Sequence, residues 1–439
     1  MNVEITKLPG GLTVATDPMP QLESASLGVW VNCGARHETK PLMGISHMLE
    51  HMAFKGTERR TARDIAEEIE AVGGALNAYT SREQTAFHAR ILKEDVPLAV
   101  DILGDILTHP VFDTNELERE RQVVLQEIGQ ARDTPDDIVF DHLQSAIYPD
   151  QAMGWPILGS EETVSGFVRG DLDTYMRANY RAGGMTLIAS GAVEHERMVD
   201  LALKHFGDLR SGEGPANEPA RYVGTDLRVE EELEQVHVTY AFPGVRSGDD
   251  ALFAAQVYVT ALGGGMSSRL FQEIREKRGL CYSIYAFANS FVDGGAIAIY
   301  AGTGEKEAAE ISGLVAEQMA ELARTVDGDE IARAKAQLRS ALLMGLERPS
   351  ARAEQIAAHL LAYGRVVPIA EIKEKLEAVT VDDIRRVAKG LVAAGRPALA
   401  AIGPLRNLES YETFACRFGS APPSPCREAR NVRPAHAAG

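Results

Sequence analysis

The residues His47-Met48-Leu49-Glu50-His51 place two imidazoles and a carboxylate within little more than one turn of a predicted helix. Helical positions i, i+3 and i+4 lie on one face, so His47, Glu50 and His51 are expected to point in the same direction. Two histidines spaced in this way are able to bind one Zn²⁺ ion, and a glutamate beside them is able to activate a bound water. The stretch has the H-x-x-E-H order, the reverse of the commoner H-E-x-x-H arrangement. It predicts a metal-binding helix.

The composition of the chain limits the classes of function. A length of 439 residues is too great for one hydrophobic core and indicates about two to four domains. The 45% hydrophobic and 25% charged fractions are those of an ordinary globular protein. The net charge of -18 argues against nucleic acid as a partner. It favours cationic partners such as basic peptides, unless the surplus only maintains solubility.

Targeting and redox signals are weak. The first residues lack the pattern of a signal or import peptide, and no apolar run reaches the roughly 18 residues that span a bilayer. Four cysteines without a C-x-x-C pair predict reduced thiols. We therefore expect a cytoplasmic, bacterial protein with no membrane partner.

Predicted helices and strands recur in the same order on both sides of a segment over 208–221, which is rich in Gly, Pro and charge and predicts a linker. Superposing 116–125 on 330–339 places Ala334 opposite Glu120 and Ala341 opposite Glu127. The second copy therefore keeps the helix and lacks the carboxylates, as it also lacks H-x-x-E-H. The alternative is ordinary α+β alternation without a repeat.

The repeat predicts an α+β protein with two homologous α/β-sandwich domains of about 200 residues each. The N-terminal domain, which carries the metal-binding helix, is expected to span 1–215, and a non-catalytic domain of the same fold 223–415. Residues 416–439 are rich in Pro, Ala and Arg without periodicity, which predicts a disordered tail.

A third metal ligand is needed, because a catalytic zinc site takes three protein ligands and keeps one position for water. The segment 116–128 offers Glu120 and Glu127 beside an apolar stripe, where a carboxylate is costly to bury without a cation or a metal. The two residues are separated by two helical turns, or about 10 Å, so both cannot bind one ion directly. One is expected to be a ligand and the other to orient a histidine. Spacing alone does not decide between them.

Three segments resemble the pitrilysin/insulysin (M16-type) family of inverted zinc metallopeptidases, in particular its mitochondrial processing peptidase β subunits and their bacterial homologues. They are H-M-L-E-H-M-A-F-K-G-T (47–57), N-A-Y-T-S-R-E-Q-T (77–85) and E-R-E-R-Q-V-V-L-Q-E-I (118–128), and the resemblance covers roughly residues 1–410. It implies a zinc-dependent metalloendopeptidase. It also implies that each domain packs helices on a mixed, mainly antiparallel sheet, and that the chain forms half of a clamshell.

The resemblance also assigns roles at the metal. Glu127, 76 residues after His51, matches the third zinc ligand of the family, and Glu120 matches its supporting glutamate. Glu50 matches the general base. With a single zinc ion on His47, His51 and Glu127, Glu50 is expected to accept the proton of the attacking water and pass it to the leaving amine.

Two further sets of residues match substrate-binding positions. Asn77 and Ala78 lie on 75–80, which resembles the edge strand to which an extended peptide adds. Arg275 and Tyr282 match a pair that binds substrate and stabilises the developing oxyanion. From pattern alone, the first set could be an ordinary interior strand and the second set plain surface residues.

Specificity is expected to depend on three more side chains. Phe54 matches a position that receives an aromatic or apolar side chain after the cut. Asp137 and Asp141 match an acidic pair that holds an arginine shortly before the cut, although a solvated acidic helix face explains the same pattern.

The sequence thus favours an endopeptidase for short or unfolded peptides, including basic, presequence-like ones. The alternatives are a general oligopeptide-degrading peptidase of the same family and a non-catalytic core or partner subunit. Catalytic motif residues are typically lost in such subunits, whereas all are present here. The family implies a dimer, either a homodimer or a heterodimer with a related subunit, in which Arg275 and Tyr282 act in cis or in trans.

Overall fold

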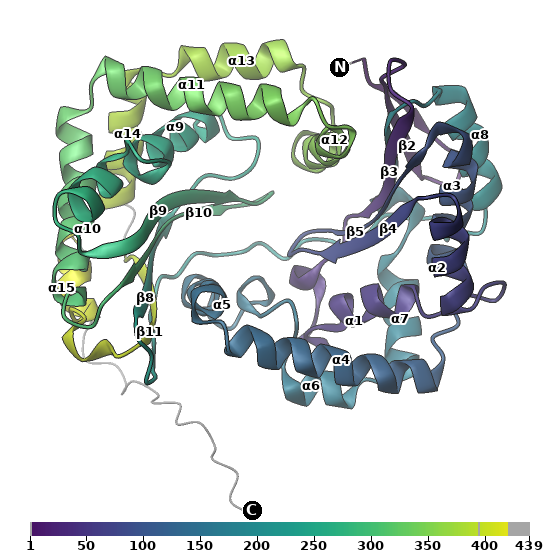
Figure 1. Ribbon diagram of the computed structural model, residues 1–439, viewed down its shortest axis with the longest axis horizontal. Coiled ribbons are helices and arrows are strands. Elements are labelled where there is room, and N and C mark those ends of the chain that lie inside the picture. Colours follow the sequence, from purple (N-terminus) through teal and green to yellow (C-terminus); the bar gives the residue numbers. More distant parts are fainter. Residues whose placement is uncertain (1, 394–395, 420–439) are drawn as a thin grey trace, which may run out of the picture.

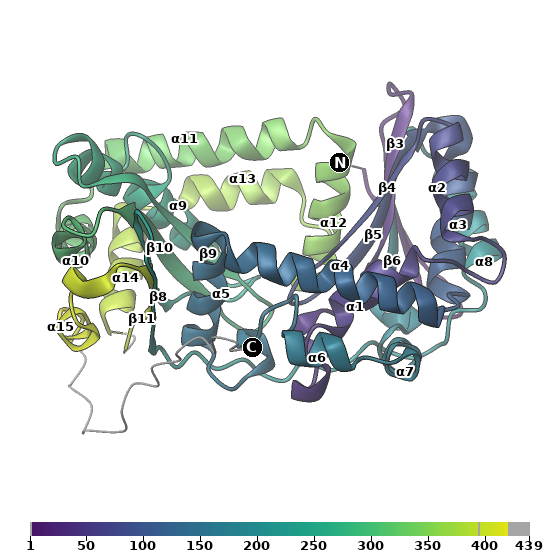
Figure 2. The ribbon, with the colours of Figure 1, turned by 60° about the horizontal axis from the view of Figure 1, so that its bottom comes forward.

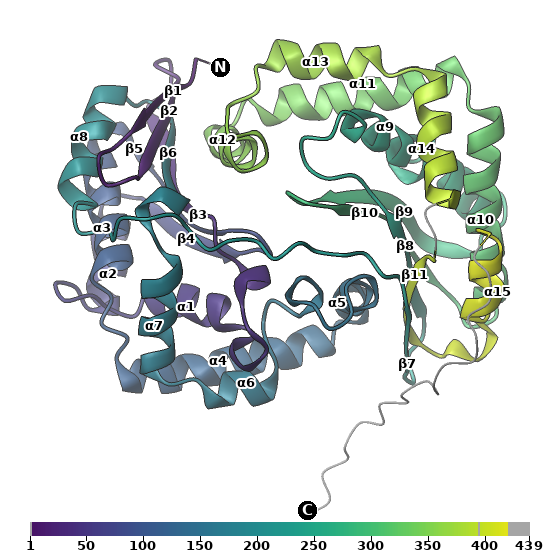
Figure 3. The same cartoon turned by 180° about the vertical axis from the view of Figure 1, so that it is seen from behind.

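The computed structural model describes residues 2–393 and 396–419 and shows two α/β halves, each built around one sheet (Figure 1). The first sheet contains β1 (Glu4–Lys7), β2 (Thr13–Pro18), β3 (Ser24–Val31), β4 (Ala75–Thr80), β5 (Thr85–Leu92) and β6 (Met185–Gly191). The second contains β7 (Asp226–Glu230), β8 (Val236–Pro243), β9 (Cys281–Ser290), β10 (Gly295–Thr303) and β11 (Ala398–Gly403). An extended segment between the two halves leads into β7 (Figure 3).

The helices of the first half are α1 (Ile45–Ala53), α2 (Ala62–Ala71), α3 (Val96–Thr108), α4 (Thr114–Arg132), α5 (Pro135–Ile147), α6 (Glu161–Gly166), α7 (Arg169–Asn179) and α8 (His195–His205). Those of the second half are α9 (Leu252–Gly263), α10 (Ala308–Thr325), α11 (Gly328–Gly345), α12 (Pro349–Tyr363), α13 (Ile369–Ala378), α14 (Val381–Ala393) and α15 (Tyr411–Cys416). None of the helices in the described residues is long and apolar enough to cross a membrane.

The two sheets confirm the predicted repeat. The first sheet has the strand order β1-β2-β6-β3-β5-β4, and the second has β7-β11-β8-β10-β9, so five strands correspond one to one. Each sheet is antiparallel except for one parallel pair, β2 with β6 and β11 with β7. Both α4 and α11 begin after an aspartate, Asp113 or Asp327, whose carboxylate accepts hydrogen bonds from the first turn. The fold is therefore the predicted pair of homologous, mainly antiparallel α/β sandwiches.

One helix of each half packs on the sheet of the other half (Figures 1 and 2). Helix α5 packs on β11 and β8, where Leu143 and Ala146 are buried against small residues of the second sheet. Helix α12 packs on β6 and β3, where Ile356 is fully buried beside Trp30. Both helices begin with proline, which suits the first turn because it lacks an N–H. The exchange joins the halves through buried apolar surface.

Two equivalent hairpins, β4–β5 and β9–β10, meet at their turns. The guanidinium of Arg36, itself 4% exposed, donates to Glu83 of the first turn and to both carboxylate oxygens of Asp293 in the second. Glu83 also accepts a hydrogen bond of 3.1 Å from the backbone N–H of Val292. Because Arg36 is charged at all relevant pH values and has carboxylates on both sides, it fixes the two turns against each other.

The ordered second half extends further than expected. Phe418 is 3% exposed, and its ring centroid lies 4.7 Å from that of Phe242. Phe414 and Phe418, spaced four apart, form the apolar side of the last turn, so a tail beginning at 416 was predicted too early. The rest of that predicted tail, 420–439, lies outside the described residues.

Candidate metal centre

Helix α1 carries the H-x-x-E-H motif on a buried support. Its apolar residues at spacings of three and four, Ile45, Met48, Leu49 and Met52, are all fully buried in the core of the first half. Gly44, directly before the helix, adopts a φ of 91° and approaches Gly159 too closely for a side chain. These constraints fix the direction of the helix.

A carboxylate from outside the helix caps its first turn. Glu38 is 5% exposed, and its carboxylate accepts hydrogen bonds from the backbone N–H groups of Gly44 at 2.7 Å and Ser46 at 2.9 Å. These are donors that a helix leaves without partners at its N-terminus. Burial raises the pKa of Glu38 to about 7, against the opposing effect of these hydrogen bonds. No local sequence pattern indicates this contact, because Glu38 lies in the loop before the helix.

The imidazoles of His47 and His51 converge with the Glu127 carboxylate. Nε2 of each histidine lies 3.6 Å from Oε2 of Glu127, and one ligand atom from each residue lies within 4.8 Å of the others. Ligand bonds of about 2.0–2.2 Å around a tetrahedral zinc ion require donor atoms at such separations. The two nitrogens and one carboxylate oxygen are donors that zinc accepts. These three residues therefore fit a zinc ion.

The charge state of His47 also suits a ligand. Burial, reinforced by the neighbouring His51, lowers the pKa of His47 to about 4. The imidazole is therefore neutral near pH 7 and keeps a lone pair for a metal. Its Nδ1 atom is buried and has no hydrogen-bond partner among the described residues.

Glu120 contacts the side of the His51 ring that faces away from the three donor atoms. The side chain is 8% exposed, with Oε2 2.9 Å from Nδ1 of His51 and Oε1 2.6 Å from the ammonium of Lys55. Of the two candidates on α4, Glu127 thus faces both histidines and Glu120 contacts only the far side of one. Lys55, which the sequence reasoning missed, neutralises the buried carboxylate.

Glu50 points to the end of the edge strand. Its Oε2 accepts a 2.6 Å hydrogen bond from the hydroxyl of Thr80, the last residue of β4. Burial raises the pKa of Glu50, while the Thr80 hydrogen bond opposes the shift. A raised pKa makes a carboxylate a better proton acceptor. Thr80 was not singled out by the sequence, although it belongs to the N-A-Y-T-S-R-E-Q-T segment.

The predicted edge strand is an edge strand in the structure. β4 ends the first sheet and pairs only with β5 among its described neighbours, with Asn77 exposed and Ala78 half-buried. Phe54 follows α1 directly, and its ring centroid lies 6.1 Å from that of Phe87. These three residues lie on the elements that flank the motif helix.

Arg275 precedes β9 and Tyr282 is the second residue of this strand of the second sheet, whereas α1 belongs to the other half (Figure 1). Arg275 belongs to a π-helical turn (Phe271–Glu276), and its guanidinium carbon lies 4.5 Å from the ring centroid of Phe271 and 5.2 Å from that of Tyr282. Tyr282 is 76% exposed. The structure therefore brings Arg275 and Tyr282 together, in the half of the molecule that does not contain α1. Phe271, spaced four before Arg275, was missed.

The acidic pair on α5 differs in environment along the helix. Asp137 is exposed, whereas Oδ1 of Asp141 lies 3.4 Å from the guanidinium of Arg82. Burial raises the pKa of Asp141, against the attraction of Arg82. Asp141 therefore already faces a cation of its own chain, which no local sequence pattern indicates.

Comparisons with known proteins agree with this geometry. The model for insulinase (peptidase family M16) matches residues 13–161, and that for the peptidase M16 inactive domain matches 166–338. An uncharacterised zinc protease of Rickettsia felis is 38% identical over 92% of this chain and 98% of that protein. The mitochondrial-processing peptidase subunit beta of Blastocladiella emersonii is 37% identical over 93% of this chain and 90% of that protein.

Solved structures share the fold. A protease from Helicobacter pylori superposes with a TM-score of 0.85 at 19% identity, covering 91% of this chain and 99% of that one. A chain of complex III2 from Candida albicans gives a TM-score of 0.83 at 21% identity, covering 94% and 99%. With two family models matched in succession and zinc proteases aligned over nearly its whole length, the chain belongs to peptidase family M16, the insulinase family of zinc metallopeptidases.

Proposed function

We propose that the chain is a zinc metalloendopeptidase in which His47, His51 and Glu127 bind the metal and Glu50 is the general base. The observation that carries this proposal is the convergence of the three donors beside a half-buried glutamate, at the end of an open strand edge. Zinc bound there would polarise the peptide carbonyl and lower the pKa of water.

Different residues of the chain then have different roles in peptide binding and proton transfer. A peptide added to β4 is held by backbone hydrogen bonds that need no particular sequence. Glu50, next to the end of β4, takes the proton from the attacking water and returns it to the leaving amine. Glu120 holds the Nδ1 side of His51, which leaves Nε2 directed at the metal position.

The test separates metal binding from proton transfer. Wild-type protein and Glu50→Gln should contain equal zinc, while Glu50→Gln should lose at least about 100-fold in cleavage of an unfolded peptide. Glu127→Ala should lose both zinc and activity, because only two of the three protein ligands, the histidines, remain. A zinc-free wild-type protein, or full activity of Glu50→Gln, would contradict the proposal.

For the substrate, we propose short or unfolded peptides of the processing type. Phe54 would contact an apolar side chain after the cut, and exposed Asp137 with Asp141 would receive a basic side chain before it. The Arg82–Asp141 contact weakens the second part, since a substrate guanidinium must share that carboxylate. Comparing the cleavage rates of paired peptides with Arg or Ala before the cut tests the preference for a basic side chain. Equal cleavage of both peptides would favour a general oligopeptide-degrading peptidase.

We further propose that the chain works as a dimer, either with itself or with a related subunit. The place of Arg275 and Tyr282 in the second half supports this, because a second copy would offer its own pair to a peptide held at α1. The bacterial relatives support a bacterial enzyme, for which we propose the cytoplasm. A non-catalytic role is disfavoured, because His47, Glu50, His51 and Glu127 are all present.

A further inference from the structure

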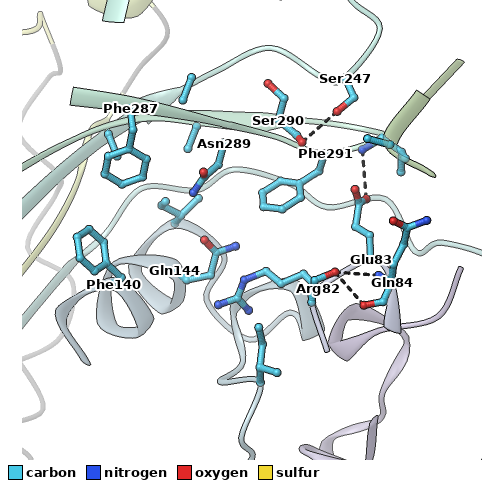
Figure 4. A pocket seen from close by; sticks show the side chains of 18 of the residues that line it. Arg82, Glu83, Gln84, Phe140, Gln144, Ser247, Phe287, Asn289, Ser290 and Phe291 are labelled. Carbon is cyan, nitrogen blue, oxygen red and sulfur yellow. Dashed lines mark hydrogen bonds between the residues drawn. The ribbon is translucent and has the colours of Figure 1, made fainter. Parts of the chain in front are cut away.

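A cavity of about 490 Å³ lies where the two halves meet (Figure 4). The first half contributes the turn Ser81–Gln84 after β4 and one side of α5. The second half contributes the end of β9, part of β10 and the last turns of α12. Its volume lies within the range of pockets that bind small ligands or side chains.

The walls of this cavity are fixed. The two hairpin turns that border it are tied together by Arg36 and by the Glu83–Val292 hydrogen bond, which Figure 4 shows. On another side the rings of Phe140 and Phe287, one from each half, meet edge to face with centroids 5.7 Å apart. The shape of the cavity therefore depends on both halves and is present before a ligand binds.

The exposed lining is mainly apolar, although the amide side chains of Gln84, Gln144 and Asn289 also contribute to it. Three phenylalanines face it, together with aliphatic side chains from α5 and α12 and small residues of β10. The aromatic and aliphatic residues of the lining are Phe140, Phe287, Phe291, Leu143, Ile147 and Leu361. Aromatic and aliphatic walls gain free energy by removing apolar surface from water, in proportion to the area that a ligand covers.

The charged groups that line the cavity are already engaged. Glu83 is bound by Arg36 and by a backbone N–H, and Arg82 donates to the carbonyl oxygens of Met153 at 3.3 Å and Trp155 at 2.7 Å. The third charged group, Asp141, faces Arg82. A charged ligand entering the cavity would lose hydration without gaining a free counter-ion. The chemistry of the site thus favours an uncharged, apolar group.

The cavity continues the proposed peptide path. Thr80 contacts the general base Glu50, and the next residue, Ser81, lines the cavity. A peptide that pairs antiparallel with β4, the slightly more stable pairing, runs from the Thr80 end of the strand toward Ala75. Residues N-terminal to the cut then lie beyond Thr80, at the cavity.

We propose that this cavity is a specificity pocket that binds an aromatic or large aliphatic side chain of the peptide substrate, N-terminal to the scissile bond. The inference rests on the proposed endopeptidase function and adds a determinant that neither half contains alone. The cavity shares Asp141 with the acidic pair, but Asp141 faces Arg82 and Glu83 is held by Arg36, so among the described residues it presents no unpaired carboxylate to a ligand.

The test uses the full-length zinc-loaded protein and a set of unfolded peptides that differ at one position at a time before the cut. Each position carries Phe, Trp, Leu, Ala, Arg or Asp. One position should show kcat/KM for Phe or Leu about tenfold above that for Ala, the discrimination expected of an apolar pocket. Equal values for all residues at every position, or a preference only for Arg, would overturn the proposal.

A variant links the preference to the cavity. Leu361→Trp should fill it and abolish the preference for Phe while the Ala peptide is still cleaved. Leu203→Trp, the same change at a half-exposed site on α8, should keep the preference. An unchanged preference in Leu361→Trp would refute the assignment.

A second variant covers the case in which Leu361→Trp does not fold. Phe291→Ala enlarges the cavity and should shift the preference from Leu toward Trp, and an unshifted preference would count against the pocket. Failure of the underlying function gives a different result, since a wild-type protein without peptidase activity cleaves none of the peptides.

Discussion

Oε2 of Glu120 lies 2.9 Å from Nδ1 of His51, while Nε2 of the same ring lies 3.6 Å from Glu127. A proton on Nδ1, shared with the Glu120 carboxylate, leaves the Nε2 lone pair free for a metal. The two glutamates of α4 therefore act on opposite sides of one imidazole. Lys55 completes the arrangement by balancing the charge of Glu120.

Replacing Glu120 should weaken zinc binding without abolishing it. Glu120→Gln keeps the shape of the side chain but removes the charge that His51 and Lys55 face, so zinc affinity should fall by about 10–100-fold. Competition with a chelating dye measures this. Glu118→Gln, on the exposed side of the same helix, is the matched control, and equal affinities of the two variants would show that Glu120 does not orient His51.

Glu38 predicts a pH dependence of stability. Its pKa is raised to about 7 from an ordinary 4.5, so the folded protein holds a proton that the unfolded chain releases. The resulting stability is fully present below pH 4.5 and is lost as the pH rises through 7. Over that window the wild-type free energy of unfolding should fall by about 3 kcal/mol relative to Glu38→Gln.

Urea unfolding of metal-free protein at several pH values measures this difference. Other titrating groups are common to both proteins and cancel in the comparison. A wild-type-minus-variant difference that stays constant between pH 4.5 and 8 would be inconsistent with a buried, titrating Glu38.

Replacing Arg275 should lower turnover without changing the zinc content. Its guanidinium contacts the rings of both Phe271 and Tyr282 and, in the part of the chain that is described, forms no ion pair. Arg275→Ala should lower kcat/KM by about 100-fold through loss of charge stabilisation, with zinc and thermal stability retained. Arg278→Ala removes a neighbouring arginine that is paired with Glu273 and should leave kcat/KM unchanged. Equal activity of both variants would place Arg275 outside the reaction.

The exchanged helix α12 predicts that a change in the second half destabilises the first. Ile356 is fully buried between α12 and the first sheet, so Ile356→Ala should lower the free energy of unfolding by about 2–5 kcal/mol. Hydrogen exchange should show the loosening at β3 and β6. Leu203→Ala at a half-exposed position is the control and should stay within about 0.5 kcal/mol of wild type.

The sequence allowed prediction of those features that depend on local spacing or internal similarity. The motif helix follows from the spacing of His47, Glu50 and His51, and the repeat follows from the matching order of elements. The sequence does not predict what an amphipathic face packs against. The periodicity of α5 shows that one side of the helix is buried, but it does not show which sheet that side contacts. The contacts of Asp141 with Arg82 and of Glu50 with Thr80 join segments that only the fold brings together.

The boundary of the second half shows the same limitation. The composition of 416–439 is tail-like on average, yet Phe418 belongs to the last turn that packs on the core. A window average does not resolve a single aromatic residue at the edge of such a segment.

The exchange of α5 and α12 bears on why the second half is kept although it carries none of the metal-binding side chains. A fragment ending in the linker would retain the zinc donors but leave the face of the first sheet around Trp30 bare, and would expose the side of α5 that carries Leu143. Such a fragment would tend to aggregate rather than to hydrolyse peptides. The second half thus covers apolar surface that the first half cannot bury alone, so a duplicated gene of this kind can lose the metal-binding residues of one copy but not the copy itself.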